Sequence, residues 1–134
     1  MLSLKYIIIP FSVTILSQSI KVLLEFIKYR KFSLNRFING MGGMPSTHSA
    51  LVSSLTCLIY LEEGTSSLFA VTLFFSLIVI YDAMGIRYES GRQAKYINML
   101  VGSNLKEKIG HKPLEVLMGI LFGILITLII DVTL

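Results

Sequence analysis

The chain has 134 residues, enough for one domain, so we expect residues 1–134 to form a single unit. Hydrophobic residues make up 54% and charged residues only 15%, whereas about a quarter of an average soluble domain is charged. The net charge of +4 is compatible with nucleic acid, but cations and aromatic residues do not interleave, which favours contacts with anionic lipid headgroups or phosphate.

Four apolar segments approach the length of about 20 helical residues that a hydrocarbon core requires. They are predicted at about Leu4–Ile27, Ser46–Leu61, Ser67–Met84 and Pro113–Val132. Polar residues such as Ser17, Gln18 and Lys21 indicate that one face of the first segment packs against protein. The second is short for a full span and is expected to begin in a recess lined by protein. In the fourth, the spacing of Gly119 and Gly123 favours close packing against another helix.

The predicted fold class is therefore all-α, an integral membrane bundle of about four transmembrane helices. Its connections differ: residues 62–66 form a short acidic turn, whereas residues 28–45 and 85–112 are long, basic and contain glycine. Ten of the twelve lysines and arginines fall in the two long connections. This bias predicts an integral protein, expected in a bacterial plasma membrane, with the long connections in the cytoplasm.

Within the second long connection, residues 92–110 are predicted to form an interfacial helix. The side chains expected to face the bilayer are those of Tyr96, Ile97, Leu100 and Val101.

Three polar clusters, distant in sequence, fall on the side of the long connections. They are GGMPSTHSA before the second segment, YDAMGIRYESGR at the end of the third and GHKPLEV at the start of the fourth. In the first cluster, Pro45 and Ser46 favour a helix start, where free N–H groups and the helix dipole attract an anion. A histidine beside that anion, His48, is suited to give a proton to a leaving oxygen. The alternative is an interfacial histidine beside a plain helix cap.

In the third cluster, His111 precedes Glu115 by four residues, so the two side chains can share a helix face. A carboxylate bonded to one ring nitrogen leaves the other nucleophilic. The alternative is a surface histidine with a glutamate favoured by the helix dipole. Because His48 and His111 are the only histidines and both lie at predicted helix starts on one side, we favour a shared site.

In the middle cluster, Asp82 lies near the end of an apolar segment, where an acid usually has a partner. We expect it to orient a cation, and Arg87 and Arg92 are near in sequence. Their planar donor groups suit phosphate oxygens, although nonspecific binding of lipid headgroups is an alternative for each.

Together, the three clusters resemble the divergent branch of the type 2 phosphatidic acid phosphatase family, over nearly the whole chain. That superfamily includes lipid phosphate phosphatases and vanadium haloperoxidases. The resemblance implies that His48 is the general acid and that His111 is the nucleophile that forms a phosphohistidine. Glu115 would replace the aspartate that orients the nucleophile. The sequence departs from the superfamily pattern at Thr47, which replaces a glycine, and at Leu105, where an arginine is expected.

The function implied is the hydrolysis of a phospholipid or isoprenoid lipid phosphate or pyrophosphate, such as phosphatidylglycerol phosphate. We expect no metal, no cofactor and no nucleic-acid partner. The K-x6-R-P block of the superfamily has no match, so cations from elsewhere would help to hold the phosphate. The predicted substrate-binding residues are Gly42, Gly43, Ser46, Thr47, Arg36, Asp82, Arg87 and Arg92. Membrane members usually have six helices, so a homodimer would complete the wall of the site.

Two other functions are alternatives. The stretch DAMGIR faintly resembles the start of the CDP-alcohol phosphotransferase motif, but that motif needs further aspartates, and none lies between Asp82 and Asp131. The second is a non-catalytic lipid-binding or transport-associated protein that retains the phosphatase fold, which the departures from the superfamily pattern favour.

Overall fold

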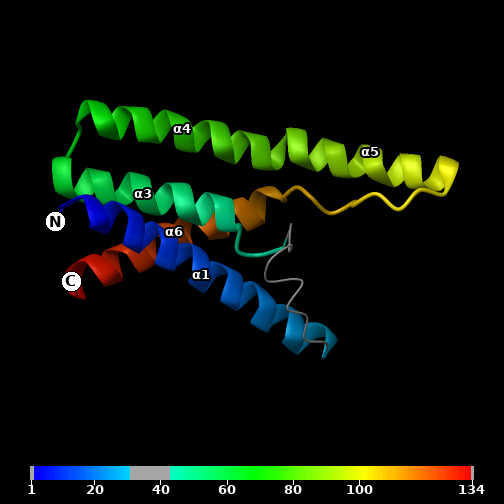
Figure 1. The fold of residues 1–134 in the computed structure, drawn as a ribbon, viewed down its shortest axis with the longest axis horizontal. Coiled ribbons are helices and arrows are strands. Elements are labelled where there is room, and N and C mark those ends of the chain that lie inside the picture. Colours follow the sequence, from blue (N-terminus) through cyan, green and yellow to red (C-terminus); the bar gives the residue numbers. More distant parts are fainter. Residues whose placement is uncertain (1, 31–42, 134) are drawn as a thin grey trace.

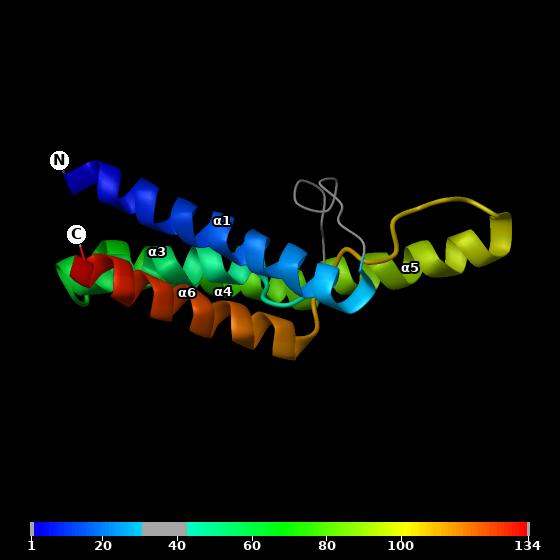
Figure 2. The ribbon, with the colours of Figure 1, turned by 90° about the horizontal axis from the view of Figure 1, so that it is seen from below.

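The computed structural model describes residues 2–30 and 43–133, and within these ranges the secondary structure is helical, without strands. The helices are α1 (Leu2–Tyr29), α3 (Thr47–Glu63), α4 (Ser67–Met84), α5 (Ile86–Val101) and α6 (Pro113–Thr133) (Figure 1). Helices α1, α3, α4 and α6 form a bundle in which α3 contacts the other three (Figures 1 and 2). The all-α prediction is confirmed, and the four predicted segments match these helices to within two residues at each end.

Within the described residues, three helical stretches are long and apolar enough to cross a membrane. They are Leu4–Tyr29, Ser67–Val101 and Pro113–Thr133. The middle stretch joins α4 and α5, which continue each other across Gly85 (Figure 1). Helix α3 has only 17 residues and lies among the longer helices. Its start is buried, in agreement with the prediction that it begins in a recess lined by protein.

Hydroxyl groups join α3 to its neighbours. The Ser54 Oγ lies 2.6 Å from the Thr127 Oγ1 of α6, and the Thr56 Oγ1 lies 2.7 Å from the Ser76 Oγ of α4. Small polar side chains let helix backbones approach and form hydrogen bonds across helices in an apolar medium. Helix α3 is therefore rich in serine and threonine because it is surrounded by other helices.

Two glycines set the crossing of α3 and α6. A Cβ on Gly119 would stand 2.5 Å from the Ser46 carbonyl oxygen, and one on Gly123 would stand 2.4 Å from that of Ala50. Even a methyl group does not fit at either position without a shift of the backbone. The predicted close packing at these glycines is confirmed, and it fixes the start of α3 against α6.

The predicted interfacial helix over residues 92–110 is wrong in its bounds. The helix begins at Ile86, directly after α4, and ends at Val101, because Gly102 adopts a left-handed conformation with φ of 65°. The chain then returns beside α5 without helical structure as far as Lys112. We call residues 86–112 the α5 arm; it prolongs α4 beyond the bundle (Figures 1 and 2).

The connections divide the bundle into two ends. The chain enters α3, leaves α4 and enters α6 at one end, which we call the loop end (Figure 1). Both termini and the turn at residues 64–66 lie at the other, the turn end. There, Lys5 pairs with Glu62 and Asp131, which ties α1 to α3 and α6. The described segments that flank both long connections therefore lie at the loop end, as predicted, while residues 31–42 lie outside the described residues.

Candidate active site

The best-defined polar pair at the loop end is His111 with Glu115. The backbone N–H of His111 donates to the Ala83 carbonyl oxygen at 3.0 Å, which ties the segment before α6 to the end of α4. His111 is 4% exposed, and its Nδ1 lies 3.0 Å from the Glu115 Oε2. The Glu115 carboxylate also accepts the Lys112 N–H at 3.2 Å, which fixes its direction. Because the carboxylate faces Nδ1, the favoured tautomer of the neutral ring carries its proton on Nδ1 and its lone pair on Nε2.

The surroundings of His111 favour the neutral ring. Burial lowers the pKa of His111 below its usual value of 6.5, and the positive charge of Lys21 adds to this effect. The Glu115 carboxylate and the backbone of Gly43, which lies against the ring, act in the opposite direction. The neutral imidazole, which is the nucleophilic form, therefore predominates near neutral pH.

Glu115 also positions the start of α3. Its carbonyl oxygen accepts the Ser46 N–H at 3.0 Å, and Ser46 caps α3 by accepting the Ser49 N–H on its hydroxyl. The predicted capping position of Ser46 is confirmed. Its side chain is fully buried and its hydroxyl lies 2.9 Å from that of Ser49, so these groups serve the fold. The N–H groups of Thr47 and His48, in the first turn of α3, precede the first intrahelical hydrogen bonds.

Lys21 is the site residue that the sequence analysis missed. It projects from α1, is 5% exposed, and donates from its Nζ to the Thr47 Oγ1 at 3.1 Å. Thr47 in turn donates to the Gln18 Oε1 at 3.2 Å. The sequence placed Lys21 on the protein-facing side of its helix without assigning it to the site. The sequence could have indicated this role, because a lysine within an apolar helix is costly and usually has a function.

The second histidine interacts electrostatically with these groups. His48 is exposed at the second position of α3, and Lys21, Arg87 and His111 all act electrostatically on it. Arg87 is held by Asp82, whose Oδ2 accepts from the Arg87 Nε at 2.5 Å. The prediction that Asp82 orients an arginine is confirmed. Side chains from α1, α3, α5 and the segment before α6 thus share one region.

The remaining predicted site residues differ in their surroundings. Gly43 has a φ of 85°, and a Cβ there would stand 3.7 Å from the stem of Lys21. Arg92 pairs with Glu89 at 3.0 Å on the exposed surface of α5. Gly42 and Arg36 lie outside the described residues.

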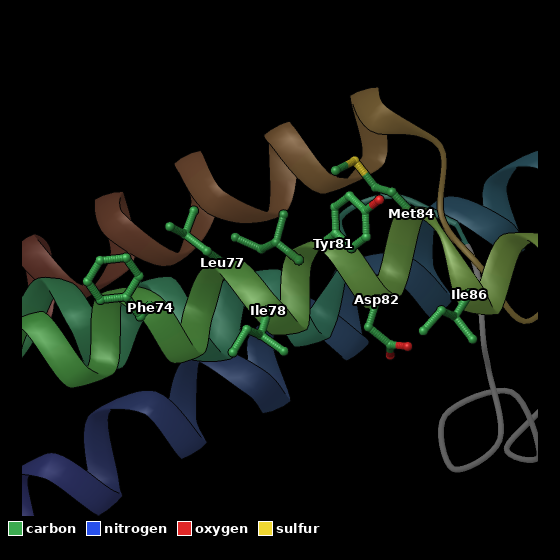
Figure 3. Close-up of a pocket in the computed structure, with 8 residues that line it drawn as sticks. Phe74, Leu77, Ile78, Tyr81, Asp82, Met84 and Ile86 are labelled. Atoms are coloured by element: carbon green, nitrogen blue, oxygen red, sulfur yellow. The ribbon is translucent and has the colours of Figure 1, made fainter.

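An open apolar depression of about 550 Å³ follows the outer face of α4 (Figure 3). Its lining residues are Phe74, Leu77, Ile78, Ile80, Tyr81, Asp82, Met84 and Ile86. Neither histidine lines it. The depression reaches the loop end at Asp82, the residue that holds Arg87. An apolar surface therefore leads along the bundle to a charged pair beside His48.

Comparisons with known proteins agree with the membrane fold. A family model described as the divergent PAP2 family matches residues 2–126. A protein of Bacillus subtilis (strain 168), described as the uncharacterized membrane protein YuiD, is 41% identical, and the match covers 87% of each chain. No solved structure matches the chain significantly.

Proposed function

Because the chain belongs to the divergent PAP2 family, we propose that this membrane protein is a phosphatase acting on a lipid phosphate or lipid pyrophosphate. The observation that carries the proposal is the gathering of the His111–Glu115 pair, His48 and the buried Lys21 at one end of the bundle. A nucleophile with its orienting carboxylate, a second histidine and a buried cation are the groups that a phosphohistidine mechanism requires.

In the first step, the Nε2 of His111 attacks phosphorus in line and the bond to the leaving oxygen breaks. Glu115 holds the proton on Nδ1 and stabilises the positive charge that the ring acquires. His48 in its imidazolium form gives a proton to the leaving alcohol or phosphate and becomes neutral. Burial and the positive charge of Arg87 lower the pKa of His48, so the population of this acid form falls as the pH rises. The Gly43 backbone, which lies against the ring, borders the position that we propose for the phosphoryl group.

Cations and backbone donors hold the equatorial oxygens during this step. Lys21 supplies a buried positive charge beside both histidines, and Arg87 supplies a planar donor group oriented by Asp82. The first N–H groups of α3 add donors and the positive end of the helix dipole. Preorganised donors of this kind are commonly the largest source of catalysis in group transfer.

In the second step, water attacks the phosphohistidine. His48, deprotonated in the first step, accepts the proton from that water, and inorganic phosphate leaves as the bond to Nε2 breaks. His111 is thereby returned to its neutral form.

The apolar depression on α4 supports a lipid as the substrate. It combines apolar residues such as Phe74 and Leu77 along the bundle with the Asp82–Arg87 pair at its end. A lipid needs this order, because its chains lie in the bilayer core while its phosphate lies at the edge. We further propose that the loop end faces the cytoplasm of a bacterial cell, since the long connections carry most of the cations.

The test uses the purified full chain in bilayer nanodiscs with a panel of substrates: phosphatidic acid, phosphatidylglycerol phosphate and an isoprenyl pyrophosphate. We expect phosphate release without added magnesium, inhibition by vanadate, and an acid-labile phosphoenzyme when the reaction is quenched early. If no substrate turns over and no phosphoenzyme forms, the proposal fails.

A non-catalytic lipid-binding protein is the second candidate, and a specific observation favours it. The hydroxyls of Ser46 and Thr47, expected to contact phosphate, form hydrogen bonds within the protein. Labelled lipid phosphate that binds to nanodisc-embedded protein, without turnover of any substrate in the panel, would select this candidate.

A further inference from the structure

The α5 arm ends in a group of exposed apolar side chains, which we call the arm tip: Met99, Leu100, Val101 and Leu105. The first three are 72%, 84% and 73% exposed, and Leu105 is 46% exposed. Contiguous apolar surface of this kind on a protein marks a place that binds a membrane or another molecule. The tip lies beyond the end of the bundle, so the neighbouring helices do not cover it (Figures 1 and 2).

The arm is held by specific contacts and is not a frayed helix end. The Asn98 side chain donates to the Leu105 carbonyl oxygen at 2.9 Å and accepts the Leu105 N–H at 2.9 Å and the Ser103 hydroxyl at 2.7 Å. Farther back, a Cβ on Gly91 would stand 2.2 Å from the Glu107 carbonyl oxygen, so the returning chain packs directly on α5. These contacts hold the apolar side chains of the tip in a defined loop.

The arm also carries the net charge of the chain. Residues 86–112 contain six lysines and arginines and two glutamates, a balance of +4, which equals the net charge of all 134 residues. Lys95, Lys106 and Lys108 are exposed and lie close to the tip in sequence. Apolar side chains bordered by cations match an anionic lipid surface, whereas two positive arms repel each other. The charge therefore favours a membrane over a second copy of the chain.

We propose that the arm tip inserts into the anionic headgroup region of the bilayer that holds the bundle. The flanking lysines contact lipid phosphates, and Leu100 and its neighbours enter the boundary with the acyl chains. In the structure α5 prolongs α4, so the proposal includes a bend of α5 toward the bilayer at Gly85, whose φ of −95° and ψ of −91° lie outside the helical region. This inference does not depend on the phosphatase activity.

The test exploits the absence of tryptophan from the chain. Leu100→Trp in the full chain introduces a single indole at the most exposed position of the tip. The protein is placed in nanodiscs of phosphatidylcholine alone or mixed with phosphatidylglycerol, each with brominated acyl chains. We expect blue-shifted emission and strong bromine quenching in the discs with phosphatidylglycerol, and weak quenching in phosphatidylcholine. Circular dichroism and gel filtration confirm the fold.

Matched charge neutralisations complete the design, both in the Leu100→Trp background. Lys106→Gln with Lys108→Gln removes two cations near the tip, and each such cation contributes about fivefold to binding of an anionic surface. The ratio of docked to free arm should fall about 25-fold. Lys28→Gln with Arg30→Gln removes two exposed cations from the end of α1 and should leave quenching unchanged.

Three results would overturn the inference. The first is emission typical of an indole in water without quenching. The second is equal quenching in both lipid mixtures. The third is a blue shift without bromine quenching that appears only when two copies share a disc, which would assign the tip to a contact between copies.

Discussion

The two ends of the bundle both gather charged side chains, but they use them differently. At the turn end, Lys5 pairs with Glu62 and Asp131, so the charges join three helices to one another. At the loop end, Lys21 is almost fully buried and acts on both histidines, and a carboxylate holds one of those rings. Both are lysines on α1, but Lys5 joins helices at the turn end, whereas Lys21 places a positive charge near the two histidines at the loop end. The proposed chemistry therefore belongs to the loop end.

The most severe way to test this contrast is to remove the nucleophile. His111→Ala should lower phosphate release by about 10³-fold or more, because the proposed covalent intermediate forms on the ring that this substitution removes. The measurements are steady-state release from the best lipid of the panel and trapping of the phosphoenzyme, which should vanish. Retention of full turnover in folded His111→Ala protein would remove His111 from the mechanism.

A matched pair of substitutions compares the two lysines directly. Lys21→Met should lower kcat/KM by about 10²-fold, the typical loss when one preorganised group that stabilises the transition state is removed. Lys5→Met should leave kcat/KM within about twofold and lower the thermal unfolding midpoint, because Glu62 and Asp131 lose their partner. If both variants lose activity to the same extent, the two ends do not have separate roles.

The pH dependence of kcat/KM tests the pKa of His111 at the loop end and the effect of Glu115 on it. Because burial lowers the pKa of His111 below 6.5, the neutral nucleophile should persist as the pH falls through 6.5, and the acidic limb should lie below that value. Glu115 raises this pKa, so Glu115→Gln should move the limb to still lower pH. At the plateau, activity should fall about tenfold, because glutamine keeps a hydrogen bond and loses its charge-assisted part.

The control for this shift is Glu89→Gln, which neutralises an exposed carboxylate paired with Arg92 on α5. Its profile should match that of the unmodified protein. A limb that moves to higher pH in Glu115→Gln would show that the carboxylate does not act on His111 as the geometry indicates.

The sequence predicted most of the bundle because its signals are local. The bounds of α4 were matched because Ser66 caps the start of an unbroken apolar run and Gly85 follows its end. The His111–Glu115 pair was also predictable, since four residues of spacing place both on one helix face. These features depend on neighbours in the chain, which the sequence displays directly.

The features that were missed depend on packing between distant segments. Lys21 joins the site only because α1 lies against the start of α3, so that its ammonium meets Thr47, 26 residues away. The direction of α5 was missed because Gly85 ends one helix without turning the chain, and a glycine in the sequence does not indicate which outcome follows. Contacts of this kind require the position of both partners in space.

The smallest expected effect concerns the bundle between the two ends. Gly123→Ala places a methyl group where a Cβ would stand 2.4 Å from the Ala50 carbonyl oxygen, and such overpacking costs about 1–3 kcal/mol. Alanine regains about 1 kcal/mol of helix propensity, so the net loss should be about 1 kcal/mol, seen as a modestly lower thermal midpoint. Met118→Ala, at an exposed position of α6, is the control and should change the midpoint less. Turnover should hardly change in Gly123→Ala, because Ala50 lies in α3 beyond His48.

By contrast, Gly119→Ala pushes on Ser46, which caps α3 beside the site, and should lower turnover as well. Equal turnover in the two glycine variants would show that the position of the α3 start does not control the site.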